Sequence, residues 1–85
     1  MATIIKSDGQ CIETQPKNKT DFKLEELQEI VGGYIEVLTL NDEEIMVINE
    51  EGKVDGLPLN LKATDIYALD FIVGDVLVCK SNEVK

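Results

Sequence analysis

Two consecutive glycines, Gly32 and Gly33, follow the one clearly amphipathic segment of this chain and lead directly into a β-rich run. Apolar residues recur at helical spacing before the glycines, at Leu24, Leu27, Ile30 and Val31. A glycine placed after the last periodic residue is a common helix end, because it adopts the left-handed conformation without a steric cost. The pattern predicts a helix that Thr20 or Asp21 caps and that ends at about Val31.

Short β-rich runs separated by turn residues make up most of the remaining chain. ATIIK (2–6) and CIET (11–14) flank Asp8-Gly9, which is a strong hairpin signal. Asn41-Asp42-Glu43 and then Glu51-Gly52 are further turns. The other predicted strands are YIEVLTL (34–40), EIMVIN (44–49) and VLVC (76–79). We expect the last six residues of the sequence, 80–85, to fray.

The segment before the last predicted strand, residues 52–70, does not have the pattern of a strand. Gly56 and Pro58 exclude a central strand there. A short helix from about Ala63 to Leu69, capped by Asn60 or a neighbour, fits this segment best. The predicted class is therefore α+β: an antiparallel sheet of about five strands, one main helix and a second short helix. Residues 1–85 are expected to form a single domain, with the hairpin at 2–14 as part of it.

The charge of the chain lies in its middle third. Residues 25–51 carry nine carboxylates and no cation, whereas the net charge of the whole chain is −9. All eight cations are Lys, and there is no His, Arg or Trp. Without His, Ser-His and Cys-His catalysis and the common zinc sites are excluded. We therefore expect no enzymatic activity, no cofactor, no metal site and no direct contact with nucleic acid. The alternative is an enzyme that uses carboxylates alone or with Mg²⁺.

The apolar residues predict a small core and a cytoplasmic protein. No apolar run reaches the roughly 18 residues that span a bilayer, and the start is too polar for a signal peptide. Cys11 and Cys79 are expected as buried hydrophobic residues, with a disulfide as the alternative. The four aromatic residues are expected in the core or half-buried: Phe22, Tyr34, Tyr67 and Phe71. The alternative for a tyrosine is an exposed position that anchors an interface.

Several motifs resemble one family of small domains. LEELQ-x-I-VGGYIE (24–36), NEEGK (49–53), GLPLN-x-x-AT-x-x-Y (56–67) and IVGDVLVC (72–79) are similar to domain-of-unknown-function family 3846. This family is met in phages, plasmids and bacterial mobile elements. The resemblance spans about residues 22–80, with the N-terminal hairpin outside its strongest part. It implies a fold and a mobile-element origin, and no activity. By analogy with other small acidic phage proteins, it raises the hypothesis of an inhibitor of host defence.

The acidic block carries the leading functional hypothesis. A carboxylate surface complements a basic groove, such as the nucleic-acid channel of a CRISPR or restriction nuclease, and would bind and inhibit that host protein in the bacterial cytoplasm. The whole acidic block, from the outer side of the helix to the strands and turns after the glycines, is expected to form one continuous face. The residues singled out for contact with the partner are Glu36, Asp42, Glu43, Glu44, Glu50 and Glu51. The structural alternative is a solvated face that keeps the protein soluble and protects the sheet edges.

The segment GLPLNLKAT (56–64) offers a second hypothesis. A homo-oligomer could sequester a nucleotide signalling molecule or another small ligand at a subunit interface. The residues that would line this pocket are Gly56, Asn60, Lys62 and Thr64. The structural interpretation, which the sequence favours, is the start of a short helix capped by Asn60 or Thr64. In that interpretation the three leucines of the segment belong to the core: Leu57, Leu59 and Leu61.

Overall fold

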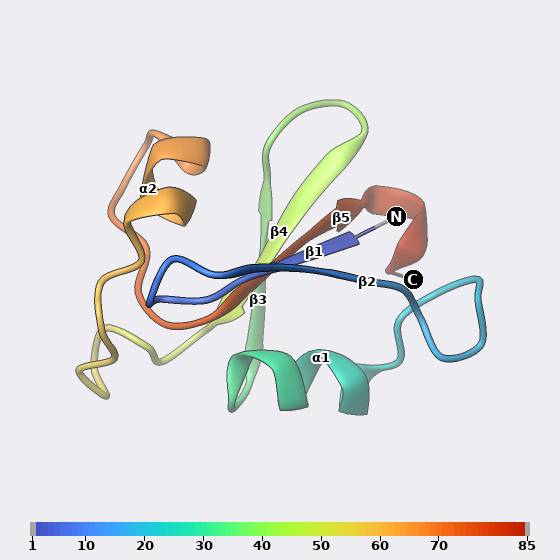
Figure 1. Cartoon of the computed structure of the whole chain (residues 1–85), viewed down its shortest axis with the longest axis horizontal. Coiled ribbons are helices and arrows are strands. Elements are labelled where there is room, and N and C mark those ends of the chain that lie inside the picture. Colours follow the sequence, from blue (N-terminus) through green and yellow to red (C-terminus); the bar gives the residue numbers. More distant parts are fainter. Residues whose placement is uncertain (1, 85) are drawn as a thin grey trace.

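The computed structural model describes residues 2–84, which form five strands, two α-helices and a 3₁₀-helix (Figure 1). The strands are β1 (Ala2–Ile5), β2 (Cys11–Thr14), β3 (Ile35–Thr39), β4 (Glu44–Asn49) and β5 (Val76–Lys80). The helices are α1 (Leu24–Val31), α2 (Leu61–Tyr67) and η1 (Ser81–Glu83). The predicted α+β class is confirmed.

The strands form one sheet in the order β2-β1-β5-β4-β3, and all neighbouring pairs are antiparallel. The last strand of the chain, β5, therefore lies at the centre and joins the β1–β2 hairpin to the β3–β4 hairpin. Leu77 of β5 is paired with Ile4 on one side and with Val47 on the other. Leu77 and Val47 are completely buried.

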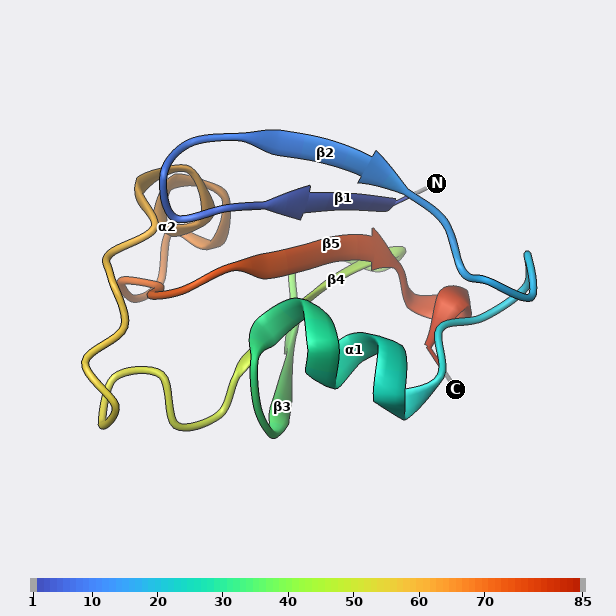
Figure 2. The ribbon, with the colours of Figure 1, turned by 60° about the horizontal axis from the view of Figure 1, so that its bottom comes forward.

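Both faces of the sheet carry a hydrophobic core. Helix α1 covers one face, and α2 covers the other face at one end of the sheet (Figures 1 and 2). Successive side chains of a strand point to opposite faces. Val47 accordingly packs in the cluster of Leu27 and Val31 from α1, whereas Met46 packs in the cluster of Ala63 from α2. Within residues 2–84, neither helix has the length and apolarity that crossing a membrane requires.

Helix α1 begins later than predicted. Its N-cap is Lys23, not Thr20 or Asp21. The side-chain oxygen of Asn18 accepts hydrogen bonds from the backbone N–H of Thr20 at 2.9 Å and of Asp21 at 3.0 Å. These bonds hold both residues in a turn of their own, so neither is free to start the helix. The end at Val31 is as predicted, since Gly32 is left-handed with a φ of 82°. Helix α2 has the expected cap, Asn60, and lies at 61–67 instead of 63–69.

Several residues predicted to be buried are exposed. They are Cys11, Leu24, Tyr34, Leu59, Leu61 and Phe71. Their positions explain the difference: Cys11 lies on an edge strand, and Tyr34 directly precedes one. Cys79 on the central strand is buried as predicted, and both cysteines are free thiols.

The predicted fraying of the C-terminal segment is wrong for residues 80–84. Lys80 belongs to β5, and Val84 pairs with Phe22 in a parallel bridge. The backbone N–H of Phe22 also donates a hydrogen bond to the carbonyl of Glu83 at 2.6 Å. The segment that precedes α1 thus holds η1 in place. Residue 85 lies outside the described residues.

Candidate functional site

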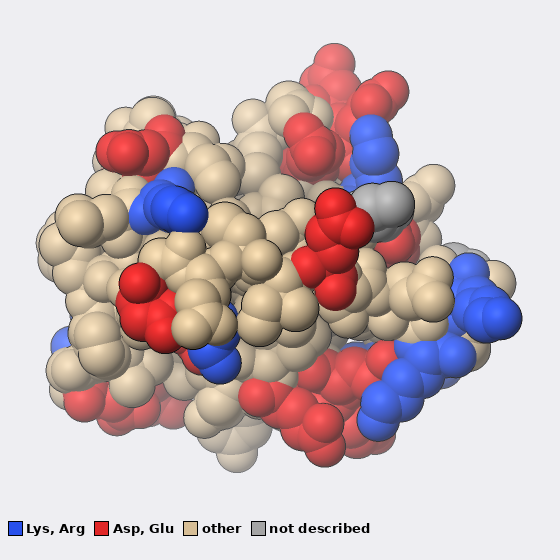
Figure 3. Space-filling model, in the orientation of Figure 1, with Lys and Arg blue, Asp and Glu red and all other residues tan. Residues whose placement is uncertain are grey.

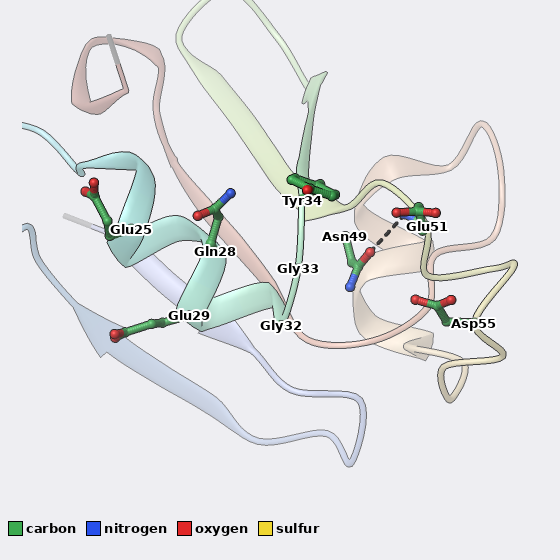
Figure 4. Close-up of a pocket in the computed structure, with 9 residues that line it drawn as sticks. All are labelled: Glu25, Gln28, Glu29, Gly32, Gly33, Tyr34, Asn49, Glu51 and Asp55. Atoms are coloured by element: carbon green, nitrogen blue, oxygen red, sulfur yellow. Dashed lines mark hydrogen bonds between the residues drawn. The ribbon is translucent and has the colours of Figure 1, made fainter.

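A cavity of about 570 Å³ lies where α1 ends and β3 begins, and we call it the acidic cleft (Figure 4). Its lining comes from α1, from the glycine pair and from the segment after β4. The lining residues are Glu25, Gln28, Glu29, Gly32, Gly33, Tyr34, Asn49, Glu51 and Asp55. Figure 4 shows Glu25 and Glu29 on α1, and Glu51 and Asp55 across from them beyond Gly33.

Asn49 forms the fixed floor of the acidic cleft. It ends β4 and is 7% exposed. Its side-chain Nδ2 donates a hydrogen bond to the carbonyl of Val31 at 3.2 Å, and its Oδ1 accepts one from the N–H of Glu51 at 2.9 Å. A Cβ atom at position 33 would come within 3.0 Å of the same Nδ2. The glycine at position 33 therefore lets the Asn49 amide lie against the chain and connect both walls of the cleft.

The charged side chains that line the acidic cleft are all negative. Its four carboxylates are Glu25, Glu29, Glu51 and Asp55. All four are exposed, and no Lys among residues 2–84 forms an ion pair with them. The C-terminus of α1 also faces this region, and its last turn carries no basic residue. Because a helix C-terminus bears partial negative charge, it adds to the field of the carboxylates. The cleft is therefore suited to cationic groups.

Tyr34 gives the acidic cleft an aromatic surface. Its side chain is 66% exposed at the cleft, where a core or half-buried position was predicted. A tyrosine ring attracts a Lys or Arg head group placed over its face. The alternative that an exposed tyrosine anchors an interface did not single out Tyr34, although its position directly after the helix-ending glycines was a signal. Glu25 and Glu29 belonged to the predicted acidic block but were not among the residues singled out for partner contact, and Asp55 lay outside that block. Only the folded chain brings these three together with Glu51.

The carboxylates predicted to bind a partner lie in three separate places. Glu51 lines the acidic cleft, whereas Glu36 and Glu50 line a neighbouring cavity of about 290 Å³ beside β3, which we call the β3 pocket. The other three lie at the β3–β4 turn or where β4 begins: Asp42, Glu43 and Glu44. Glu44 and Glu50 are separated by the whole of β4, about 20 Å at about 3.3 Å per residue.

The acidic surface is therefore not one continuous face. Figure 3 shows one group of acidic atoms over the β3–β4 turn and another over α1 on the opposite side of the molecule. The group at the turn is partly neutralised, since Lys80 pairs with Glu43 at 3.4 Å. In addition, Glu44 accepts a hydrogen bond from the Asn41 side chain at 3.2 Å.

The polar atoms of the GLPLN segment are used within the fold. Asn60 is 1% exposed, and its Nδ2 donates to the carbonyls of Ile5 at 2.9 Å and Gly74 at 2.8 Å. Its Oδ1 accepts from the N–H of Ala63 at 3.0 Å. The Thr64 hydroxyl donates to the carbonyl of Asn60 and accepts from a neighbouring N–H.

The other two residues of the predicted ligand pocket lie on the surface. Lys62 Nζ donates to the carbonyl of Gly9 at 2.7 Å, and Gly56 lies in an exposed turn. Leu59 and Leu61 are 47% and 67% exposed, so only Leu57 of the three leucines is partly buried. The cap at Asn60 is as the structural interpretation predicted, whereas its core positions for Leu59 and Leu61 are wrong. The hydrogen bonds of Asn60 hold the start of α2 against β1 and the turn before β5.

The acidic side chains do not converge on a single point. Within residues 2–84, no three carboxylate, thiol or imidazole groups lie close enough together to hold a metal ion. The carboxylates of the acidic cleft instead stand on its two walls (Figure 4).

These features describe a small α+β domain with an acidic cleft at the end of its main helix. The whole chain, residues 1–85, matches the family described as domain of unknown function (DUF3846), and the protein belongs to that family. The match includes the N-terminal hairpin, which the sequence motifs had left outside the strongest part of the resemblance. Neither a curated protein nor a solved structure matches the chain.

Proposed function

We propose that this domain is a non-enzymatic protein-binding module whose acidic cleft receives Lys or Arg side chains of a partner protein. One observation carries the proposal: four exposed carboxylates without a Lys partner in residues 2–84 surround a cavity of about 570 Å³ that also contains an exposed tyrosine. Such a cavity offers hydrogen-bond acceptors and an aromatic face, and both suit an ammonium or guanidinium group.

The partner is a protein with a basic surface. The net charge of −9 repels nucleic acid, and it speeds the approach of a cationic protein surface at low salt. The nucleic-acid channel of a nuclease is a surface of this type. We therefore keep inhibition of a host defence nuclease in the bacterial cytoplasm as the specific form of the proposal. The charge of the chain and the family resemblance support that specific form.

The alternative, a sponge for a nucleotide or another small ligand, has no comparable support. Its expected pocket residues include Asn60 and Thr64, whose side chains are hydrogen-bonded to the backbone. The proposal also assigns no catalytic step, because the chain contains no His or Arg and the carboxylates of the cleft are exposed to solvent.

The test compares two variants that lose the same charge. The cleft variant is E25Q/E29Q/E51Q/D55N, and the control variant is E13Q/D42N/E43Q/E44Q. The probe is an acetylated tetra-arginine amide, with the isosteric and uncharged tetra-citrulline peptide as the control. Backbone amide NMR follows the titration, and the amides of Gly32, Gly33 and Tyr34 report on the cleft.

We expect tetra-arginine to shift these three amide signals and tetra-citrulline to leave them unchanged. The cleft variant should bind tetra-arginine about tenfold more weakly, since four exposed ion pairs contribute about 0.2–1 kcal/mol each. Added salt should weaken the binding to the wild type. Equal weakening in the control variant would mean that the peptide senses only the net charge, and the proposal would then be wrong.

A further inference from the structure

The outer edge of β3 has unpaired backbone groups. Strand β3 is the last in the sheet order and pairs only with β4 among the described residues. The N–H of Glu50 donates to the carbonyl of Tyr34 at 2.8 Å, and the N–H of Leu40 donates to the carbonyl of Glu44 at 3.0 Å. Since hydrogen-bonded and non-hydrogen-bonded positions alternate in an antiparallel pair, even-numbered residues of this strand bond to β4. The backbone groups of Ile35, Val37 and Thr39 therefore point outward.

This edge lacks several of the features by which proteins protect exposed strands, and its one charged side chain is Glu36. Its sequence, IEVLT, contains no Pro and no Lys, and its one-to-one register with β4 contains no bulge. The opposite edge of the sheet, β2, is different. The N–H of Lys6 donates a hydrogen bond to the carbonyl of Gln10, so even-numbered residues of β2 bond to β1. Only the backbone groups of Cys11 and Glu13 in β2 therefore point outward, and Pro16 lies two residues after the end of that strand. Strand β3 is thus the more open edge.

The β3 pocket lies beside this edge on the face of the sheet that α2 covers. Its apolar wall includes Leu38 and Ile48 of the sheet, with Tyr67 and Phe71 from α2 and the segment after it. Phe71 is 51% exposed, and Lys53 lies over its ring, 4.1 Å from the centroid. Lys53 also pairs with Asp70 and thereby lowers the pKa of that carboxyl group.

The charge of the β3 pocket determines which occupant it fits. Its one Lys already pairs with Asp70, whereas Glu36 and Glu50 have no Lys partner in residues 2–84. A second copy of the chain is a poor occupant. Two β3 edges paired antiparallel would bring their Glu36 side chains near each other on one face, and each copy carries a net charge of −9.

We propose that β3 accepts an extended segment of a partner protein as an added strand. The segment carries an apolar side chain that enters the β3 pocket and a Lys or Arg two residues away, on the same face, beside Glu36. The backbone groups of Ile35, Val37 and Thr39 supply the main-chain hydrogen bonds, and the β3 pocket supplies selectivity. The outward backbone groups of β3 and the carboxylates of the acidic cleft belong to different residues, so either site can bind while the other does not.

The probe is the peptide acetyl-Thr-Lys-Thr-Leu-Thr-Lys-Thr-amide, which places Lys, Leu and Lys on one face of a strand. The control peptide has Glu in place of both Lys residues. The key variant is Val37→Pro, which removes an outward N–H at an edge position where proline is tolerated. Val37→Thr is the matched control, because it keeps that N–H. Glu36→Gln tests the charge without changing the backbone.

We expect the peptide to slow hydrogen exchange at the amides of Ile35, Val37 and Thr39. Val37→Pro should weaken binding by about tenfold, as fits the loss of one main-chain hydrogen bond together with a steric block. Val37→Thr should bind like the wild type, and Glu36→Gln should weaken binding about twofold to threefold. The Glu-containing peptide should bind more weakly than the Lys-containing one.

Three results would overturn the proposal. The first is unchanged exchange at the three amides with saturating peptide. The second is wild-type affinity in Val37→Pro, provided that its NMR spectrum shows the native fold. The third is a dimer mass in sedimentation with protection of the same amides before any peptide is added, which would assign the edge to a second copy. In the cleft variant E25Q/E29Q/E51Q/D55N, the peptide should still slow hydrogen exchange at the three amides. A failure of the cleft proposal can therefore be distinguished from a failure of the β3 proposal.

Discussion

The side-chain amide of Asn49 lies 3.2 Å from the carbonyl oxygen of Val31 and donates a hydrogen bond to it. This bond connects the end of β4 to the end of α1, although β3 lies between these two elements in the sequence. Asn49 lines both the acidic cleft and the β3 pocket. The two candidate surfaces therefore share one buried side chain, and its removal should affect stability and both cavities.

We expect Asn49→Ala to lower the free energy of unfolding by about 1–3 kcal/mol. The substitution removes the partner of the Val31 carbonyl and of the Glu51 N–H, and a buried group without a partner is costly. Urea denaturation measures the change. Asn82→Ala, at an exposed position of η1, is the control and should change stability by less than about 0.5 kcal/mol. Equal effects of the two substitutions would show that the Asn49 bonds contribute little.

Gly33→Ala should be destabilising because of Asn49 itself. An added Cβ atom would lie 3.0 Å from Asn49 Nδ2, whereas a Cβ at Gly32 would meet nothing within 4 Å. In the Asn49→Ala background the added methyl group has space, so the cost of Gly33→Ala should fall by about 0.5 kcal/mol or more. Gly32→Ala serves as the comparison, since its cost arises from the left-handed φ of 82°. A double-mutant cycle by urea denaturation that finds no coupling for Gly33 would contradict this account of the glycine.

Asn60→Ala should destabilise the protein more than Asn49→Ala does. Asn60 is 1% exposed and forms hydrogen bonds with the backbone of Ile5, Gly74 and Ala63. Its loss leaves two carbonyl groups without this donor and removes the cap of α2, for a total of about 2–4 kcal/mol. Asn60→Asp keeps the acceptor for the cap but cannot donate to either carbonyl, so we expect it to be no better than alanine. Thermal unfolding of the Asn49→Ala, Asn60→Ala and Asn60→Asp variants, followed by circular dichroism, tests this order of stability.

The stability of the protein should fall at alkaline pH partly through Cys79. Burial, and secondarily the negative charge of Glu83, raises the pKa of this thiol from 9.0 to about 11. A raised pKa in the folded state means that the stabilising contribution is complete below about pH 9 and is lost as the pH rises toward about 11. Cys79→Ala should therefore show a smaller loss of stability between these two pH values than the wild type. Cys11→Ser, which replaces the exposed thiol, is measured alongside as the matched variant.

Local sequence signals predicted the secondary structure well where the determining contacts are local. The Asp8-Gly9 hairpin, strand β4 at 44–49 and the Gly32 helix end are all as predicted. The start of α1 was wrong because Asn18 competes for the backbone N–H groups of the predicted cap. That competition depends on a turn whose geometry the residue types alone did not reveal.

The candidate site was less predictable than the fold. The carboxylates of α1 meet Glu51 and Asp55 because β4 returns to the end of the helix. The predicted turn at 41–43 indicates that return, whereas the path of the chain after β4, which places Asp55 at the cleft, has no local pattern that predicts it. Likewise, the predicted acidic face assumed that neighbours in sequence are neighbours in space. The length of β4 separates Glu44 from Glu50 and thereby divides that face.

The central place of β5 has a consequence for how the chain is made. In order of synthesis the two hairpins come first, and the strand that lies between them comes last. Until residues 76–80 leave the ribosome, each hairpin has an open side and lacks the partner that completes its half of the core. The nascent chain should consequently stay susceptible to proteases or to wrong strand pairing until its final segment closes the sheet in one late, cooperative step.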